Sequence, residues 1–252
     1  MKVFLSVENI NLTYQSLESE TKAIENISFT VDKGEFVSIV GPSGCGKSTL
    51  LSCIAGLTTP TSGKIRLEGK EIYGVNPQIG YMLQTDNLFP WRNIYKNVML
   101  GLEIQNKITE QNKAYVNHLL KKYGLWEFKD SYPSSLSGGM RQRAALIRTL
   151  AVRPALLLLD EAFSALDYQT RVNVSKDVYV FLRSENQTMI MVTHDIPEAV
   201  SMSDRIIVLS KRPANISLIV KTPFSKNRDT LAVRTTKEYA DCYDNVWKEM
   251  SK

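Results

Sequence analysis

A run of nine residues near the start of the chain has the residue types that bind phosphate. It follows the pattern G-x-x-x-x-G-K-[ST], in which glycines let backbone N–H groups line an anion nest. We expect Lys47 to reach the β- and γ-phosphates of a nucleotide and the hydroxyl of Ser48 to ligate Mg²⁺. An accidental match in a flexible turn would occur in about 1 chain in 100 of this length. The nucleotide-binding run consists of Gly41, Pro42, Ser43, Gly44, Cys45, Gly46, Lys47, Ser48 and Thr49.

The segments on either side of this run are those that the motif requires. Residues 36–40 are apolar and favour a buried strand, and residues 50–55 favour a helix that Gly56 can end. The helix would point its positive dipole end at the glycine-rich loop, which strengthens the attraction for phosphate. The sequence therefore predicts a strand, a phosphate-binding loop and a helix in that order.

Two adjacent carboxylates, Asp160 and Glu161, follow a second apolar run at residues 155–159. Such a run is typical of a strand buried on both faces of a parallel sheet, and ligands bind at the carboxyl ends of these strands. Alone, the pair could be a solvated strand end. Together with the phosphate loop, it predicts that Asp160 holds the metal and that Glu161 polarises the attacking water.

A third run, at residues 136–142, has a serine and two glycines where a helix begins. In isolation this pattern indicates an ordinary helix cap, although it also forms an anion site. Together the three runs resemble those of ATP-binding-cassette (ABC) ATPases, in which a run of this kind is the signature motif. The resemblance extends over nearly the whole chain and implies ATP and Mg²⁺ as cofactors. It places Ser137, Gly138 and Gly139 against the ATP that is held by a second copy.

Several other positions match the family one at a time. Tyr14 matches the aromatic residue that stacks on adenine, and a buried sheet tyrosine is the alternative. Gln84 matches the glutamine that contacts Mg²⁺ and senses the membrane partner, and His194 matches the switch histidine at the γ-phosphate. Residues 164–167 match the loop that contacts the opposite subunit. The resemblance thus implies Glu161, His194 and Lys47 as catalytic residues and Ser48, Gln84 and Asp160 as metal ligands.

Two positions depart from the usual family pattern. Ala162 follows the expected catalytic glutamate, where proline is usual, and Met140 occupies a signature position that is often glutamine. Neither position carries the chemistry, so the departures affect only the finer classification.

The segment after Gln84 contains two aromatic residues around a proline. Phe89, Pro90 and Trp91 are similar to the Leu-Pro-Trp stretch of importer ATPases of the nitrate, sulfonate and taurine group. In that family this region grips the coupling helix of the membrane subunit, and exposed aromatic side chains suit such an anchor. Core packing within the helical region is an equally weighted alternative.

Composition indicates an ordinary globular chain of 252 residues, of which 43% are hydrophobic and 23% are charged. The net charge of +5 suits an anionic nucleotide but is too small to indicate nucleic-acid binding. Three cysteines without a C-x-x-C pair favour a reducing compartment. The sequence contains no signal-peptide pattern and no apolar run of the roughly 18 residues that span a bilayer. Any membrane role must therefore come through a partner, and the resemblance implies a peripheral protein at the cytoplasmic face of the cell membrane.

The resemblance implies an α/β fold of the P-loop NTPase (RecA-like) type, with a single ABC ATPase domain over residues 1–252. We expect the parallel sheet core, together with an antiparallel β subdomain, in residues 1–87 and 153–220. An inserted helical subdomain that carries the signature is expected in residues 88–152. A C-terminal tail and helix are expected in residues 221–252.

The same resemblance implies the ATP-hydrolysing, energy-coupling subunit of an ABC importer. It would work as a head-to-tail dimer with transmembrane permease subunits and, indirectly, a solute-binding protein. Nitrate, a sulfonate or taurine is the expected solute, and bicarbonate or a vitamin precursor stays open.

Other functional classes fit the sequence less well. A soluble ABC ATPase, such as an iron–sulfur assembly ATPase, is the main alternative, and the Phe-Pro-Trp segment argues against it. Members that act in DNA repair need a long coiled coil, for which the separation of 90 residues from Lys47 to Ser137 leaves no room. A nucleotide-binding regulator without turnover is disfavoured because Glu161 and His194 are present.

Overall fold

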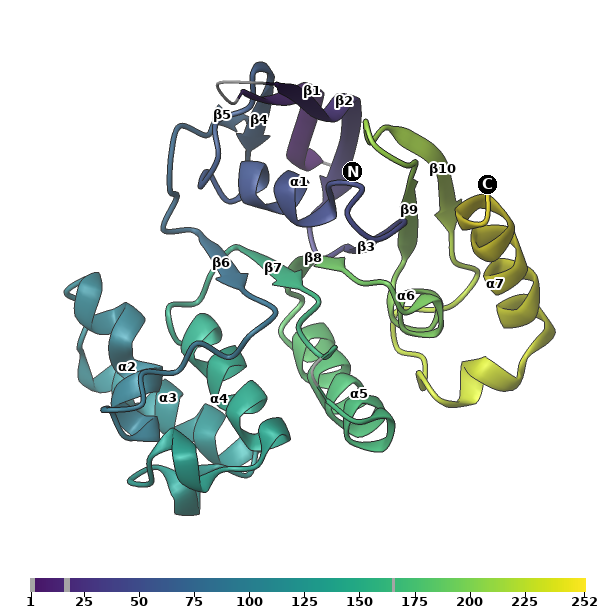
Figure 1. Cartoon of the computed structure of the whole chain (residues 1–252). Coiled ribbons are helices and arrows are strands. Elements are labelled where there is room, and N and C mark those ends of the chain that lie inside the picture. Colours follow the sequence, from purple (N-terminus) through teal and green to yellow (C-terminus); the bar gives the residue numbers. More distant parts are fainter. Residues whose placement is uncertain (1–2, 16–18, 165) are drawn as a thin grey trace.

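The computed structural model describes residues 3–15, 19–164 and 166–252. A six-stranded sheet runs through its centre and a four-stranded sheet packs beside it (Figure 1). The helices between residues 94 and 151, here called the helical lobe, lie at one end of the central sheet, and the C-terminal helix lies at the other (Figure 1).

The central sheet has the strand order β10-β9-β3-β8-β7-β6. All neighbouring strands are parallel except β10, which runs antiparallel to β9. Every residue of β3, β7 and β8 is buried, as expected for apolar runs covered on both faces. The strands are β3 (Phe36–Val40), β6 (Ile79–Met82), β7 (Leu156–Asp160), β8 (Thr188–Val192), β9 (Arg205–Leu209) and β10 (Ile216–Lys221).

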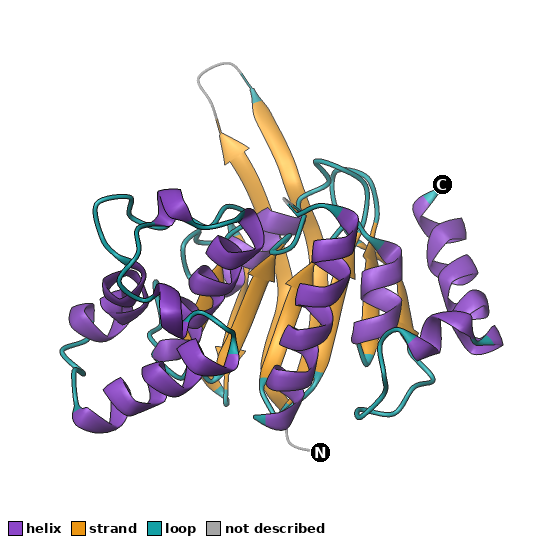
Figure 2. Ribbon diagram, turned by 90° about the horizontal axis from the view of Figure 1, so that it is seen from below, coloured by secondary structure: helices purple, strands orange, loops and turns teal. Residues whose placement is uncertain are grey.

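The second sheet is antiparallel, which confirms the expected antiparallel patch, and its strand order is β2-β1-β4-β5. Its first two strands have 13 residues each and pair with several register shifts. Their hairpin projects beyond the rest of the molecule (Figure 2). The strands are β1 (Val3–Gln15), β2 (Glu20–Asp32), β4 (Ser62–Leu67) and β5 (Lys70–Glu71).

Side-chain caps fix the starts of several helices. The hydroxyl of Thr109 accepts the N–H of Asn112 at the start of α3, and Gly124 follows the end of α3 with φ of +68°, a conformation that glycine favours. The helices are α1 (Lys47–Ile54), α2 (Ile94–Ile104), α3 (Glu110–Lys122), α4 (Gly138–Ala151), α5 (Tyr168–Ser184), α6 (Ile196–Met202) and α7 (Lys237–Met250), with short 3₁₀ turns at Trp126–Phe128, Pro133–Ser135 and Ala232–Thr235.

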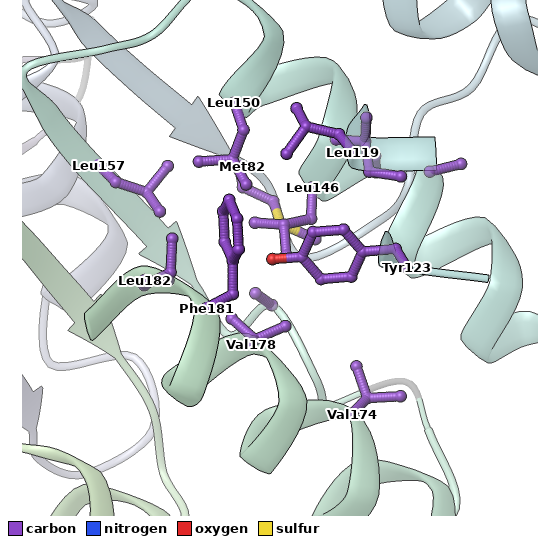
Figure 3. Close-up of a cluster of buried hydrophobic side chains, with 14 of the residues drawn as sticks. Met82, Leu119, Tyr123, Leu146, Leu150, Leu157, Val174, Val178, Phe181 and Leu182 are labelled. Atoms are coloured by element: carbon purple, nitrogen blue, oxygen red, sulfur yellow. The ribbon is translucent and has the colours of Figure 1, made fainter. Parts of the chain in front are cut away.

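One hydrophobic cluster joins the helical lobe to the central sheet (Figure 3). Phe181 of α5 packs there with Leu146 of α4, and its ring meets the edge of Tyr123 with the centroids 5.3 Å apart. Met82 of β6 and Leu157 of β7 belong to the same cluster. Because these buried groups are contiguous, the position of α4 is tied to the strands that carry the candidate site.

The C-terminal helix α7 packs on the domain, as its apolar spacing predicts. Cys242 and Val246 are buried in a cluster with residues of α6 and β9. Tyr239, Tyr243 and Trp247 stack in succession along the helix, with centroid separations of 6.3 and 6.2 Å.

Within residues 3–15, 19–164 and 166–252, no helix has both the length and the apolar character needed to cross a bilayer. The thiols of Cys45, Cys53 and Cys242 are free and buried.

Candidate functional site

The candidate site lies at the carboxyl edge of the central sheet. Four neighbouring parallel strands, β3, β8, β7 and β6, end at this edge. The segments that follow them carry Lys47, His194, Glu161 and Gln84 in turn. Parallel topology therefore gathers residues that are far apart in the sequence, at the place where open α/β sheets bind ligands.

The phosphate-binding loop joins β3 to α1. Gly44 and Gly46 have φ of +72° and +127°, values that favour glycine, and a Cβ at Gly46 would lie 3.1 Å from the carbonyl oxygen of Ala23. The buried ammonium of Lys47 donates to the carbonyl oxygens of Gly41 and Pro42, at 2.8 and 2.9 Å. No side chain caps the N-terminus of α1, so its first N–H groups are available to an anion.

Asp160 lies beside Ser48 and Tyr81. The hydroxyl of Ser48 donates to Oδ1 of Asp160 at 2.9 Å, and the phenol of Tyr81 donates to Oδ2 at 3.0 Å. Burial raises the pKa of Asp160, while these two hydrogen bonds act in the opposite direction.

The oxygen atoms of Ser48 and Asp160 fit a Mg²⁺ ion, which binds through one or two protein oxygens and the phosphates of its substrate. The described residues contain no cluster of three or more His, Cys, Asp and Glu side chains that could hold a metal by themselves. A metal at this place would therefore depend on the nucleotide for part of its coordination.

Glu161 faces two other candidate residues across the site. Its Oε2 atom lies 3.0 Å from Nδ1 of His194 and 3.5 Å from Nε2 of Gln84. The backbone of Glu161 has φ of +45°, which is uncommon for a residue other than glycine, and its N–H donates to the carbonyl of Val192 at 2.9 Å. This arrangement places a carboxylate where it can accept a proton from water at the end of β7.

Two further residues support the site in roles that the sequence did not indicate. Tyr81 holds Asp160, and Gln142 of α4 donates a hydrogen bond to the carbonyl of Ala162, next to Glu161. Gln142 is buried on the apolar face of its helix, and a polar residue at such a position is the signal that could have identified it.

Tyr14 lies on β1 with 48% of its surface exposed. The alternative of a buried sheet tyrosine is therefore wrong. Its exposed ring is accessible to a flat ligand.

The signature residues begin α4, in the helical lobe. The hydroxyl of Ser137 accepts the N–H of Met140 at 3.3 Å, and Gly138 and Gly139 form the first turn. A Cβ at Gly139 would lie 2.9 Å from a methyl group of Thr170, so the glycine allows α4 to approach α5 closely. Figure 1 shows α4 well apart from α1, and the chain does not bring its own signature to its own phosphate-binding loop.

The loop at residues 164–167 leads into α5. The carboxylate of Asp167 caps this helix by accepting the N–H of Thr170 at 3.0 Å. Ser164 donates to the carbonyl of Glu161 at 2.9 Å, and Ala165 lies outside the described residues.

Phe89, Pro90 and Trp91 form a rigid corner before α2. The rings of Phe89 and Trp91 stack at 4.9 Å, and Trp91 is 71% exposed, so the alternative of core packing is wrong for Trp91. The buried side chain of Asn97 accepts the N–H of Phe89 and donates to the carbonyls of Phe89 and Arg92. The corner therefore presents aromatic surface on a fixed backbone.

Comparison with known families and proteins supports the resemblance to ABC ATPases that the sequence motifs indicate. A family model described as ABC transporter matches residues 24–164, slightly more than half of the chain. The ATP-binding protein YtlC of Bacillus subtilis, described as an uncharacterized ABC transporter component, is 46% identical over 98% of this chain and 96% of its own length. The nitrate import ATP-binding protein NrtC of Synechococcus elongatus is 38% identical over 96% of this chain and 37% of its own length. The bicarbonate transport ATP-binding protein CmpC of the same species is 42% identical over 85% of this chain and 33% of its own length.

Solved structures show the same architecture. An ATP-binding cassette determined as a dimer in a post-hydrolysis state with ADP and Pi has a TM-score of 0.76 and 29% identity, and covers 88% of this chain and 100% of its own. A component of the ABC transporter complex cbiONQ from Clostridium perfringens has a TM-score of 0.75 and 27% identity, and covers 94% of this chain and 93% of its own. These likenesses confirm the expected P-loop NTPase fold.

Proposed function

Because the chain belongs to the ABC transporter family and is an ATPase whose hydrolysis of ATP is coupled to transport, we propose that it is the energy-coupling subunit of an importer. The solute we propose is a small anion or organic molecule such as nitrate, a sulfonate or taurine. The nitrate and bicarbonate relatives support this class of solute. The observation that carries the proposal is the convergence of Lys47, Asp160, Glu161 and His194 at one sheet edge, in a chain that also has an exposed aromatic corner at residues 89–91.

The proposed chemistry assigns one task to each group at this edge. Lys47 and the N–H groups of the phosphate-binding loop hold the outer phosphates of ATP. Mg²⁺, held by Ser48, Asp160 and Gln84, would neutralise charge on the phosphate that is transferred. The carboxylate of Glu161 accepts the proton of the attacking water, which is worth about 10²–10⁴-fold in rate. His194 orients that carboxylate through the 3.0 Å contact.

We propose that ATP draws two copies together head to tail. The start of α4, with Ser137, Gly138 and Gly139, would then face the γ-phosphate of the partner copy with its N–H groups and its positive dipole end. Tyr14 would stack on adenine, and the loop at residues 164–167 would touch the opposite copy. The dimeric state of the similar cassette bound to ADP and Pi supports the association of two copies.

We propose that the corner formed by Phe89, Pro90 and Trp91 contacts a transmembrane permease, which would hold the chain at the cytoplasmic face of the cell membrane. A solute-binding protein would act through that permease. Arg148 of α4 donates to the carbonyls of Asp86 and Asn87, just before the corner. A displacement of the corner by the permease would therefore be transmitted to the signature helix α4. We propose a division into residues 1–87 with 153–220, 88–152 and 221–252, in which Arg148 links the second unit to the end of the first beside the corner.

Affinity purification of the tagged full-length chain from membranes of its own host tests the proposal. We expect a permease and a solute-binding protein to co-purify. Trp91→Ala should abolish capture of the permease, whereas Trp247→Ala, which removes another exposed and stacked indole, should not. Recovery of neither partner would contradict the importer and favour a soluble ABC ATPase.

A further inference from the structure

Two hydrogen bonds of one side chain, Thr193, link the backbone on both sides of His194 in the segment between β8 and α6. The hydroxyl of Thr193 accepts the backbone N–H of Asp195 at 3.0 Å. The same hydroxyl donates to Oε2 of Glu198 at 2.8 Å. One side chain therefore fixes the backbone on both sides of His194, and the direction of its O–H bond is set by Glu198.

Burial makes this use of a glutamate unusual. Glu198 and Thr193 are 5% and 3% exposed. The second oxygen of Glu198, Oε1, is buried and has no hydrogen-bond partner in the described part of the molecule. A buried carboxyl group with an unpaired oxygen costs stability, and an apolar side chain would normally be preferred there.

The need to build α6 does not explain Glu198. The carboxylate of Asp195 already caps that helix by accepting the N–H of Glu198 at 3.0 Å. Arg171 reaches Asp195 at 3.4 Å and Arg234 reaches the hydroxyl of Ser201 at 3.3 Å. Neither arginine donates a hydrogen bond to Glu198 among the described residues, so the bond from Thr193 is its specific contact.

We propose that Glu198 is a positioning residue for His194. Its carboxyl accepts a hydrogen bond from the Thr193 hydroxyl, which leaves an oxygen lone pair of that hydroxyl directed at the N–H of Asp195. The backbone on both sides of His194 is thereby held so that the imidazole lies 3.0 Å from Glu161. The inference rests on the proposed role of His194 in hydrolysis.

Steady-state hydrolysis of MgATP by the full-length chain tests this inference. Glu198→Leu and Thr193→Val should each lower kcat roughly 10-fold, which is the loss expected for one hydrogen bond. The KM for ATP should change less than twofold, because neither residue touches the nucleotide. Glu198→Gln keeps an oxygen acceptor and should restore most of the turnover. Ser201→Ala, which removes another buried polar group of α6, is the matched control and should retain the wild-type kcat.

A double-mutant cycle separates positioning from a general loss of structure. If Glu198 acts through His194, Glu198→Leu should lower kcat no further in a His194→Ala background. Multiplicative losses in the cycle, or wild-type kcat in both Glu198→Leu and Thr193→Val, would overturn the inference and leave the proposed role of His194 intact. Wild-type kcat in His194→Ala itself would refute the role of His194 and the inference together.

Discussion

Replacing Glu198 by glutamine should stabilise the folded chain at neutral pH, and the gain should depend on pH. Burial raises the pKa of Glu198 from 4.5 to about 7, and the negative charge of Asp195 adds to this increase. The hydrogen bond from Thr193 and the positive charges of Arg171 and Arg234 oppose it. In the unfolded chain the carboxyl is solvated, so its pKa returns to the lower value.

The size of the effect follows from the two pKa values. Well below pH 4.5 the carboxyl is protonated in both states, and the stability of the folded chain is unaffected by its titration. As the pH rises from about 4.5 to about 7, the unfolded state loses the proton while the folded state keeps it, so the wild-type folded state becomes progressively less favourable. The loss of folding stability totals about 3 kcal/mol, at roughly 1.4 kcal/mol per pH unit between the two pKa values, and it stays constant at higher pH. Glutamine has no proton to lose and avoids this loss.

Unfolding in urea at a series of pH values, followed by tryptophan fluorescence, measures this effect. The free energy of unfolding of Glu198→Gln minus that of the wild type should rise by about 3 kcal/mol across the acid-to-neutral range, equivalent to roughly 6–12 °C in Tm. The exposed residue Glu238, in the first turn of α7, provides the control, since Glu238→Gln should show no comparable rise. A difference between Glu198→Gln and wild type that stays constant with pH would refute the reasoning.

Four other substitutions test the site and the core. Glu161→Gln should retain ATP binding, lower hydrolysis by about 10²–10⁴-fold and accumulate an ATP-bound dimer, and unchanged turnover would remove Glu161 from its role. Lys47→Ala should abolish tight nucleotide binding in a filter assay, so normal affinity would contradict the phosphate site. Tyr14→Ala should raise the Kd for ATP by about 5–150-fold, the equivalent of 1–3 kcal/mol of stacking, and an equal Kd would exclude that contact. Leu158→Ala, in a wholly buried strand, should lower the free energy of unfolding by about 2–5 kcal/mol in urea, and a loss below 1 kcal/mol would be inconsistent with its burial.

The strands that could be predicted from the sequence are those with continuous apolar runs. Residues 188–192 and 205–209 each form a strand, because a strand buried on both faces has to be largely apolar. The edge strand Ile216–Lys221 escaped prediction because it is short, Ser217 interrupts its apolar run and only one face is partly covered. This strand forms because β9 provides the hydrogen-bonding partner along its length.

The same distinction applies to the candidate site. Lys47 and Asp160 belong to short motifs, so the residues within a few positions of each are enough to predict their roles. Tyr81, Gln142 and Glu198 act through contacts that the fold creates. Tyr81 reaches Asp160 across 79 positions, and spacing along the chain carries no information about such a pair.

The left-handed backbone of Glu161 has an evolutionary consequence. At φ of +45°, a side chain other than glycine costs about 1–3 kcal/mol. Glycine at this position would relieve that cost and would also remove the carboxylate proposed to activate water. A variant library sorted only for thermal resistance should therefore enrich chains that fold better and no longer split ATP.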